Sequence, residues 1–249
     1  MRVVVEKLPE WIKKLLRKFR NIVRVLLYRG KGRLCPVCGE SSRRFCHFGV
    51  VPREDAQCAH CGSLERHRLL WVFLQNKTDL FDGKAKKMLH VAPEHCFKQK
   101  LEEQLGGGYL TADLLNPCAT VKMDVTDIQY VDQTFDVVYC SHVLEHVLDD
   151  KKAIREFFRV LKNDGWAILL VPIISEQTFE DSSIIEPQER LEAFGHHDHV
   201  RRYGLDYIDR LQEAGFVVNC YKAGDIVDDK EAVEMGLTAA SGEIYYCTK

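Results

Sequence analysis

The chain has 249 residues, of which 46% are hydrophobic and 29% are charged. This length suits one large domain, or a medium domain with a small appendage, and the composition argues against long disorder, a collagen repeat or a disulfide miniprotein. No apolar run reaches the roughly 18 residues that a bilayer span needs. The formal net charge of −2 hides a split: residues 1–33 contain 11 Lys and Arg against 2 Asp and Glu, and the remainder contains 24 against 35. A strongly basic arm therefore precedes an acidic body.

Residues 1–33 predict a basic amphipathic helix. On a wheel of about 100° per residue, one face carries only apolar side chains: Leu8, Trp11, Ile12, Leu15, Leu16, Phe19, Ile22, Val23, Leu26 and Leu27. The opposite face carries Lys13, Lys14, Arg17, Lys18, Arg20 and Arg24. Pro9 suits the first helical turn, and Gly30 and Gly32 end the helix. This pattern is typical of a helix that lies in a membrane interface, where each basic residue contributes about 1 kcal/mol.

Three partners for this helix follow from the pattern. The first is an anionic membrane surface, contacted through residues 8–27. The second is the acidic body, on which the apolar face would pack. The third is RNA, which the acidic remainder of the chain disfavours. The arm has no uninterrupted apolar region and no small-residue cleavage site, so we expect no secretory signal. We expect a cytoplasmic protein, peripheral on the inner membrane face.

Residues 34–62 predict a zinc-ribbon module. Two Cys-x-x-Cys-Gly words, with 19 residues between Cys38 and Cys58, supply Cys35, Cys38, Cys58 and Cys61. This spacing is typical of a zinc site, and four thiolates close the coordination sphere, which makes the Zn²⁺ structural. Cys46 and His47 lie between the two pairs and His60 lies inside the second, so an alternative in which one of them replaces a cysteine as ligand stays open. The duplication disfavours a redox pair. Ser63 then caps a connecting helix in residues 63–83.

Residues 84–249 predict an α/β domain, because short β-rich runs alternate with helical patterns. The expected strands are Met88–Ala92, Tyr109–Ala112, Val121–Met123, Phe135–Cys140, Trp166–Val171, Phe216–Cys220 and Glu243–Cys247. The expected helices are Phe97–Leu105, Val143–Leu148, Lys151–Leu161 and Leu205–Ala214. Their order favours a Rossmann-like, doubly wound sheet that binds its ligand at the carboxyl ends of the strands. Asp113 closes the second strand, about 20 residues after the first, where an acid can hold ribose hydroxyls.

Several words in this domain occur together and in order: YLTADL, MDVTD, FDVVYCSHVLEHV, REFFRVLKNDGWAILLVP and HVRRYGLDYIDRLQEAGFVV. From about Met88 to the C-terminus the chain resembles the class I S-adenosylmethionine-dependent methyltransferases of the type-11 group. The resemblance implies a seven-stranded sheet whose last strand is antiparallel. It also implies cofactor contacts, with the ribose at Asp113 and Leu114, the adenine at Asp124 and Val125, and the methionine part at Ser141 and His142.

The turn after the first strand departs from that family. The family has a glycine-rich turn there, which lets the backbone approach the ligand closely, whereas this chain reads Ala92-Pro93-Glu94. Ala92 is the smallest substitute for glycine, and Glu94 is expected to bind the cofactor's amino group. The opposite interpretation is a degenerate site that has lost the cofactor.

Histidines supply the expected acceptor chemistry. His142-Val-Leu-Glu-His146 also matches an inverted zinc-protease word, but the surrounding strands favour the methyltransferase. His142 follows the fourth strand and suits a general base, because its ordinary pKa lies near neutral pH. The long connection 173–203 predicts a substrate loop, in which His199 is the second catalytic candidate and Arg201 and Tyr203 bind substrate. Alternatives are a second metal site through His196, His197 and His199, or an exposed lid with solvated charges.

The sequence therefore predicts a methyltransferase (EC 2.1.1.-) that uses S-adenosylmethionine and acts on a small or membrane-associated acceptor of the lipid or glycan type. One alternative is an RNA methyltransferase whose zinc ribbon and basic arm read the RNA, although nucleic acid is the less favoured partner. Another is a non-enzymatic zinc-ribbon interaction protein on a degenerate methyltransferase fold.

Overall fold

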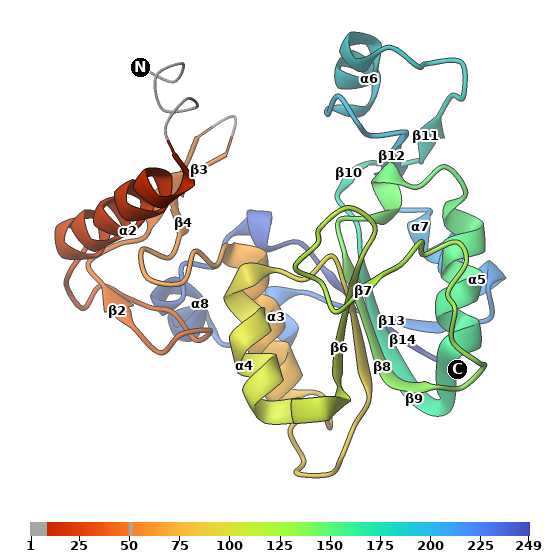
Figure 1. The fold of residues 1–249 in the computed structure, drawn as a ribbon, viewed down its shortest axis with the longest axis horizontal. Helices are drawn as coiled ribbons and strands as arrows, with labels where there is room; N and C mark the ends of the chain where they lie inside the picture. The colour runs from red at the N-terminus through yellow and green to blue at the C-terminus, as the bar shows by residue number, and fades with distance from the viewer. Residues whose placement is uncertain (1–8, 50–51) are drawn as a thin grey trace. The chain divides into compact units, whose positions relative to one another are not determined.

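A computed structural model describes residues 9–49 and 52–249 (Figure 1). The chain divides into two compact units, Met1–Phe73 with Ile226–Ser241 and Leu74–Asp225 with Gly242–Lys249. Leu8 and the rest of residues 1–8, which the sequence assigns to the basic arm, lie outside the described residues. Within the described ranges, no helix is both long enough and apolar enough to cross a bilayer.

The first unit begins with the amphipathic helix, α2 (Glu10–Leu27), directly after Pro9. Two short antiparallel hairpins follow, β1 (Arg33–Leu34) with β2 (Ser41–Ser42) and β3 (Cys46–Phe48) with β4 (Arg53–Gln57). The chain then enters α3 (Glu65–Asn76) and returns much later with α8 (Asp229–Glu234) and the 3-10 turn η4 (Ala239–Ser241).

Arg68 joins this late segment to the cysteine-rich part of the first unit. Its side chain is fully buried, and its guanidinium donates to the carbonyls of Met235 (2.6 Å), Gly236 (3.1 Å) and Ala56 (2.9 Å). The guanidinium carbon lies 4.0 Å from the centre of the Phe45 ring. Burial lowers the pKa of Arg68, and the three carbonyls supply the hydrogen bonds that a buried cation requires. The late segment is therefore an integral part of the first unit.

The second unit is built on a seven-stranded sheet, as the sequence predicts. Its strands are β5 (Met88–Val91), β6 (Tyr109–Asp113), β7 (Val121–Lys122), β8 (Phe135–Ser141), β9 (Leu161–Leu170), β13 (Val217–Tyr221) and β14 (Ile244–Thr248). They lie in the order β13-β14-β9-β8-β5-β6-β7, and only β14 is antiparallel to its neighbours. The predicted Rossmann-like sheet with an antiparallel last strand is confirmed.

Helices cover both faces of this sheet. The chief ones are α4 (His95–Leu105), α5 (Asp150–Val160) and α7 (Tyr207–Glu213), with 3-10 turns η1 (Gly106–Gly108) and η3 (Ala223–Asp225). Figure 1 shows α4 on one face and α5 with α7 on the other. Because the central strands are covered on both sides, β5 is buried along its whole length, which explains why it reads as a short apolar run rather than an alternating one.

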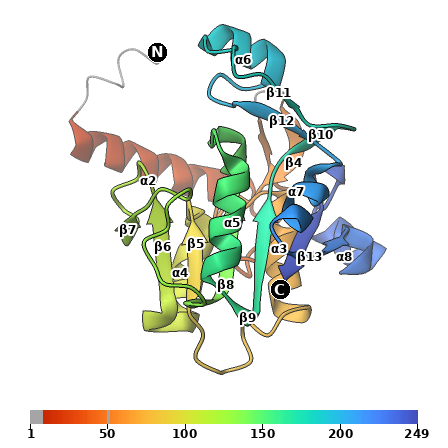
Figure 2. The same cartoon turned by 90° about the vertical axis from the view of Figure 1, so that its right-hand side faces the viewer.

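Two segments differ from the expected pattern. The expected helix over Val143–Leu148 is only a single 3-10 turn, η2 (Leu144–His146), because the backbone is left-handed at His142 (φ 55°) and already extended at Val147 (φ −94°, ψ 123°). The long connection after β9 is ordered into β10 (Ile173–Ser175), β11 (Phe179–Glu180), α6 (Pro187–Phe194) and β12 (Arg201–Gly204). Figure 2 shows this insert beyond the carboxyl end of β9.

Candidate functional site

The acidic residues predicted to bind the cofactor lie at one edge of the sheet of the second unit. Asp113 is the last residue of β6, and its Oδ1 accepts from the backbone N–H groups of Leu115 and Asn116, both at 2.8 Å. These bonds set the carboxylate's direction and leave Oδ2 without a partner among the described residues. An acid with one fixed and one unoccupied oxygen at this position fits a ribose diol. Leu114 is exposed beside it.

Asp124 follows the short strand β7. Its Oδ1 accepts from the N–H and the hydroxyl of Thr126, both at 2.8 Å, and these hydrogen bonds hold the pKa of Asp124 below its ordinary value. The carboxylate is therefore ionised at neutral pH. The neighbouring Val125 is buried. The adenine role of these two residues stays a prediction.

The turn after β5 contains alanine at the position where a glycine-rich turn is expected. Ala92 has φ 49°, in the left-handed region that favours glycine, and its N–H donates to Ala112 O at 2.8 Å. The backbone path that glycine usually supplies is thus present without glycine. Alanine adds only a methyl group, so it is the least obstructive side chain available for a close ligand approach.

Glu94 belongs to a polar network that the sequence analysis missed. Its Oε1 accepts from the Tyr139 hydroxyl at 2.6 Å, its Oε2 lies 2.7 Å from His90 Nε2, and His90 Nδ1 lies 2.7 Å from the Tyr109 hydroxyl. Burial, then the charge of Glu94, raises the pKa of Tyr139. The sequence feature that indicates this network is a histidine, His90, inside an apolar strand. Strand register places His90 directly opposite Tyr139. The network holds the Glu94 carboxylate firmly; its contact with the cofactor stays a prediction.

The segment after β8 carries the first acceptor-side candidates. Ser141 is buried at the strand end, and the His142 N–H donates to Leu170 O at 2.9 Å. His142 Nδ1 lies 3.2 Å from Oε1 of Glu145, whose side chain is almost fully buried. A carboxylate at one ring nitrogen orients the imidazole and leaves the other nitrogen for a proton, which fits the predicted base.

His199 lies against the same segment. Its ring packs edge-on to that of His146, with centroids 4.7 Å apart, and the adjacent Val200 N–H donates to Glu145 O at 2.9 Å. Burial lowers the pKa of His199, so the ring is neutral at physiological pH. The structure therefore brings His199 beside the loop that bears His142, while its catalytic role stays a prediction.

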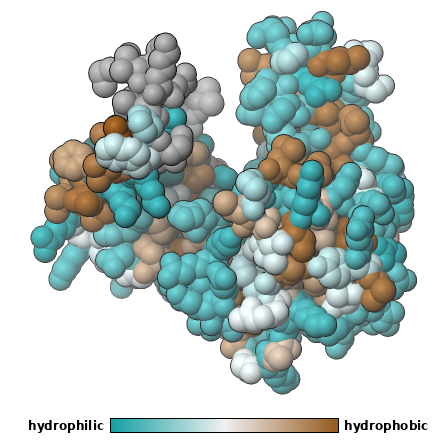
Figure 3. Space-filling model, in the orientation of Figure 1, coloured by the Kyte–Doolittle hydropathy of each residue, from teal (hydrophilic) through white to brown (hydrophobic). Residues whose placement is uncertain are grey.

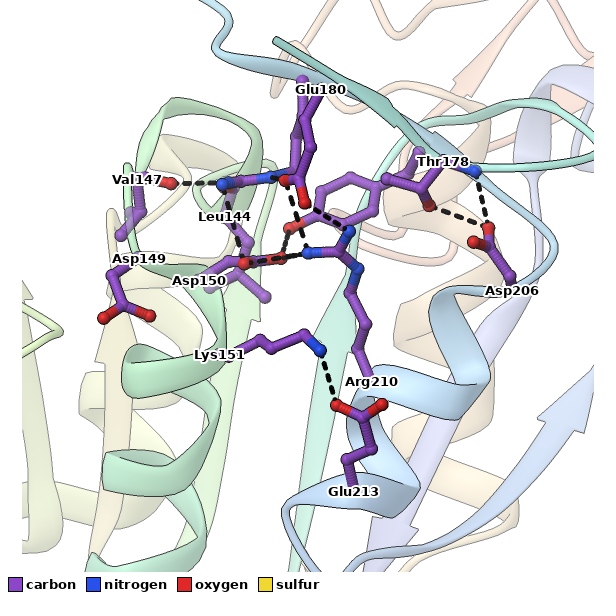
Figure 4. Close-up of polar contacts among 12 residues, drawn as sticks. Leu144, Val147, Asp149, Asp150, Lys151, Thr178, Glu180, Asp206, Arg210 and Glu213 are labelled. Carbon is purple, nitrogen blue, oxygen red and sulfur yellow. Dashed lines mark hydrogen bonds and ion pairs between the residues drawn. The ribbon is translucent and has the colours of Figure 1, made fainter. Parts of the chain in front are cut away.

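Arg201 and Tyr203, predicted to bind substrate, are both buried in a polar clamp. Figure 4 shows three labelled members of this clamp, Asp150, Glu180 and Arg210. Arg201 donates to the carbonyls of Leu144 (2.8 Å) and Leu148 (2.8 Å) and to Glu180 Oε2 (2.9 Å). These bonds fasten the loop after β8 to β12.

The phenol of Tyr203 donates to Asp150 Oδ2 at 2.6 Å, and Arg210 bridges Asp150 Oδ2 (3.0 Å) and Glu180 Oε1 (2.9 Å). Burial, then the charge of Asp150, raises the pKa of Tyr203. The contacts give Arg201 and Tyr203 a structural role; their contact with an acceptor stays a prediction. Arg201, but not Tyr203, borders a cavity of about 410 Å³ that is also lined by Asp149, Lys151, Asp181 and Arg190.

The four predicted zinc ligands lie together in the first unit. Cys35 Sγ is 3.6 Å from Cys61 Sγ, and Cys38 Sγ is 3.8 Å from Cys58 Sγ. A tetrahedral Zn²⁺ with Zn–S bonds of about 2.3 Å needs sulfur–sulfur distances of about 3.8 Å, so the cluster has the right size. Hydrogen bonds from the neighbouring thiols hold the pKa of Cys35 far below its ordinary value.

The two Cys-x-x-Cys-Gly turns, Cys35–Gly39 and Cys58–Gly62, are the knuckles of this cluster and repeat the same backbone geometry. Gly39 and Gly62 have φ 78° and 77°, and their N–H groups donate to the carbonyls of Cys35 (2.8 Å) and Cys58 (3.1 Å). Each left-handed glycine closes a turn that presents two sulfurs to one point. The geometry fits a structural zinc ion, without a position for a substrate.

Helix α2 presents its apolar face outward. Trp11, Leu15, Phe19 and Leu26 are each at least 60% exposed, and Figure 3 shows hydrophobic side chains gathered over this helix. One basic residue of the opposite face, Arg24, instead meets the cysteine module. Arg24 donates to Ala59 O at 3.0 Å and to the Gln57 side chain at 3.1 Å, an arrangement that leaves the apolar face free of that module.

Comparisons with known proteins agree with this geometry. Residues 85–169 match the family described as a methyltransferase domain. An S-adenosylmethionine-dependent methyltransferase from Mesorhizobium loti superposes with a TM-score of 0.50 at 13% identity, covering 73% of this chain and 98% of that one, which supports the fold.

Two curated relatives match over shorter regions. An uncharacterized protein of Methanocaldococcus jannaschii is 36% identical over 75 residues, 28% of this chain and 33% of that protein. Ajmaline N-methyltransferase of Rauvolfia serpentina is 27% identical over 124 residues, 47% of this chain and 43% of that protein. The chain thus spans less than half the length of these relatives.

Proposed function

Because residues 85–169 form a methyltransferase domain, we propose that the protein transfers a methyl group from S-adenosylmethionine to a small or membrane-associated acceptor. The sheet supports this proposal most directly. Its strand order, with β14 antiparallel, sets Asp113, Asp124, Ala92 and Ser141 at or just beyond the carboxyl ends of neighbouring strands, where such sheets bind ligands.

Each group at this edge has a distinct task. Asp113 holds the ribose, Asp124 and Val125 hold the adenine, and the turn at Ala92 lets the backbone approach the cofactor. S-adenosylmethionine supplies an activated methyl group when bound. The protein then orients the acceptor and excludes water, and orientation alone is worth about 7–11 kcal/mol in well-aligned reactions. His142, oriented by Glu145, removes the proton of a hydroxyl or ammonium acceptor.

Cofactor binding is tested by calorimetry with S-adenosylmethionine. Asp113→Asn keeps an oxygen that can accept from Leu115 and Asn116 but loses the charge that grips the diol. We expect its affinity to fall by at least about tenfold, the loss of one charged hydrogen bond. Asp127→Asn, at an exposed acid nearby, is the matched control and keeps wild-type affinity. Absence of binding in the wild type would support a degenerate, non-enzymatic fold instead.

We also propose that α2 holds the protein on an anionic membrane, so that its acceptors include lipids or lipid-linked glycans. The outward apolar face, rich in exposed Trp and Phe, supports this. Lys14, Lys18 and Arg20 are exposed on the same helix and supply attraction to anionic head groups.

Flotation with vesicles tests the membrane proposal. Phe19→Ser with Leu26→Ser removes two large exposed apolar groups, and we expect it to abolish recovery with phosphatidylglycerol vesicles. Val131→Ser, which alters an exposed apolar residue of the second unit, leaves recovery unchanged. Equal recovery of both variants, or steep salt-dependent binding to RNA without vesicle binding, would contradict the proposal.

A further inference from the structure

The second unit brings together a second set of metal-ligating side chains. A carboxylate oxygen of Glu145 and one ring nitrogen each from His146 and His199 lie within 4.8 Å of one another. Glu145 and His146 belong to η2, whereas His199 comes from the insert immediately before β12. The hydrogen bond from Val200 N–H to Glu145 O holds the two segments together.

Glu145 carries an unsatisfied oxygen at this point. The residue is 1% exposed, and its Oε1 is occupied by His142 Nδ1 at 3.2 Å. Its Oε2 is buried and has no hydrogen-bond partner among the residues that the structure describes. A buried carboxylate oxygen without a partner is strongly unfavourable, and a cation bound there would remove the penalty.

One of the two histidines, His146, has the carboxylate neighbour that metal-binding imidazoles usually have, and the other has both ring nitrogens available. His146 Nδ1 lies 3.4 Å from Asp198 Oδ1, which leaves Nε2 as the donor atom. A carboxylate behind the non-coordinating nitrogen is the common outer-sphere partner of a ligating histidine. In the described part of the chain, the ring nitrogens of His199 have no hydrogen-bond partner.

We propose that Glu145, His146 and His199 bind a divalent first-row transition-metal ion of the zinc type, separate from the ion of the four cysteines. Two imidazoles and one carboxylate are a ligand set that such ions accept while keeping an open coordination position. The site follows Ser141 at the end of β8, on the acceptor side of the predicted cofactor site. If the proposed methyl transfer holds, the open position serves an oxygen of the acceptor.

Metal stoichiometry tests the site independently of methyl transfer. Full-length protein without an affinity tag is titrated with Co²⁺ after its cysteine site has been loaded with Zn²⁺. We expect the wild type to bind one further equivalent, with weak visible bands and no thiolate charge-transfer band. His199→Ala and Glu145→Gln should each weaken this second binding by at least about 100-fold, since the first removes a ligand and the second replaces an anionic ligand with a neutral amide. His197→Ala, an exposed neighbour, should retain it.

Other outcomes overturn the proposal. A wild-type protein that takes up no second equivalent has no such site. Loss of the second equivalent in His197→Ala but not in His199→Ala would assign the ion to the neighbouring His196, His197 and Asp198 cluster. His199→Gln, with an unchanged far-ultraviolet circular dichroism spectrum, guards against misfolding of the alanine variant. Because the readout is bound metal, failure to bind S-adenosylmethionine would refute the proposed function and leave this test intact.

Discussion

Two of the clusters of potential metal ligands in the described part of the chain, one in each unit, are assembled differently. In the first unit, each Cys-x-x-Cys pair presents its sulfurs from one turn, and two such turns complete the cluster. In the second unit, Glu145 and His146 meet His199 only because the insert folds back as β12 and Arg201 fastens it to the loop after β8. The first cluster depends on local geometry and the second on long-range packing.

The same contrast holds for the backbone. The zinc knuckles use Gly39 and Gly62 at their left-handed positions, whereas the second unit uses Ala92 and His142, with φ 49° and 55°. A left-handed non-glycine residue persists only when its surroundings hold it. The glycine turns are therefore evident in the sequence, whereas the left-handed backbone of His142 becomes evident only in the folded sheet.

The largest expected effect is at the four-cysteine cluster of the first unit, whose size fits a Zn²⁺ ion. Structural zinc binding is worth about 10–16 kcal/mol in small zinc modules, so Cys58→Ser should unfold residues 34–62. Hydrogen exchange read by mass spectrometry should show lost protection there and retained protection in β5, β6 and β8. Cys118→Ser, at an exposed cysteine, is the control. Retained protection in Cys58→Ser would mean that the knuckles fold without metal.

Next in size is loss of the Arg201 clamp. Arg201→Met leaves the carbonyls of Leu144, Val147 and Leu148 without their buried donor and removes one of the two arginines that pair with Glu180. We expect a loss of about 3–5 kcal/mol in the free energy of unfolding. Urea denaturation of the second unit measures it. Arg155→Met, at an exposed arginine of α5, should change stability by less than about 0.5 kcal/mol. Equal values for the two variants would show that the clamp does not hold the insert.

A smaller effect is expected at Ala92. Ala92→Gly removes the strain of a left-handed alanine, about 1–2 kcal/mol. Part of this gain in stability is offset, because glycine loses more conformational entropy than alanine on folding. We therefore expect a gain of up to about 1 kcal/mol, and Ala92→Val should destabilise by more than that. Thermal unfolding of both variants decides it; a loss of stability in Ala92→Gly would mean that no strain is stored at the turn.

The smallest effect concerns the pH dependence of the clamp. Burial alone would raise the pKa of Glu180, but its ion pairs with Arg210 and Arg201 outweigh burial and hold the pKa below its ordinary value. Stability from this group is therefore complete above the unfolded pKa, about 4.3, and is lost as the pH falls through the lower folded value.

The half-exposed position of Glu180 limits this contribution to below about 1 kcal/mol. The difference in unfolding free energy between wild type and Glu180→Gln should be constant from pH 7 to 5 and should shrink below pH 4. A difference that grows with acidification would reverse the sign of the linkage.

Much of the fold could be predicted from the sequence because its signals are local. The helix after Pro9, the two zinc knuckles and all seven sheet strands depend on periodicity, turn residues or spacing within short stretches of chain. The resemblance to methyltransferases added the antiparallel last strand, and the structure confirms it.

The sequence by itself therefore determined the sheet strands, the basic helix, the spacing of the four cysteines and the acidic strand ends. Only the tertiary structure decided that the segment around α8 completes the first unit through Arg68, that Arg201 is an internal clamp, and that Glu145 meets His199. These features join residues far apart in the chain, and no local pattern encodes which distant partner a buried charge will find. Burial makes an unpaired charge costly, so the packed fold selects the partner.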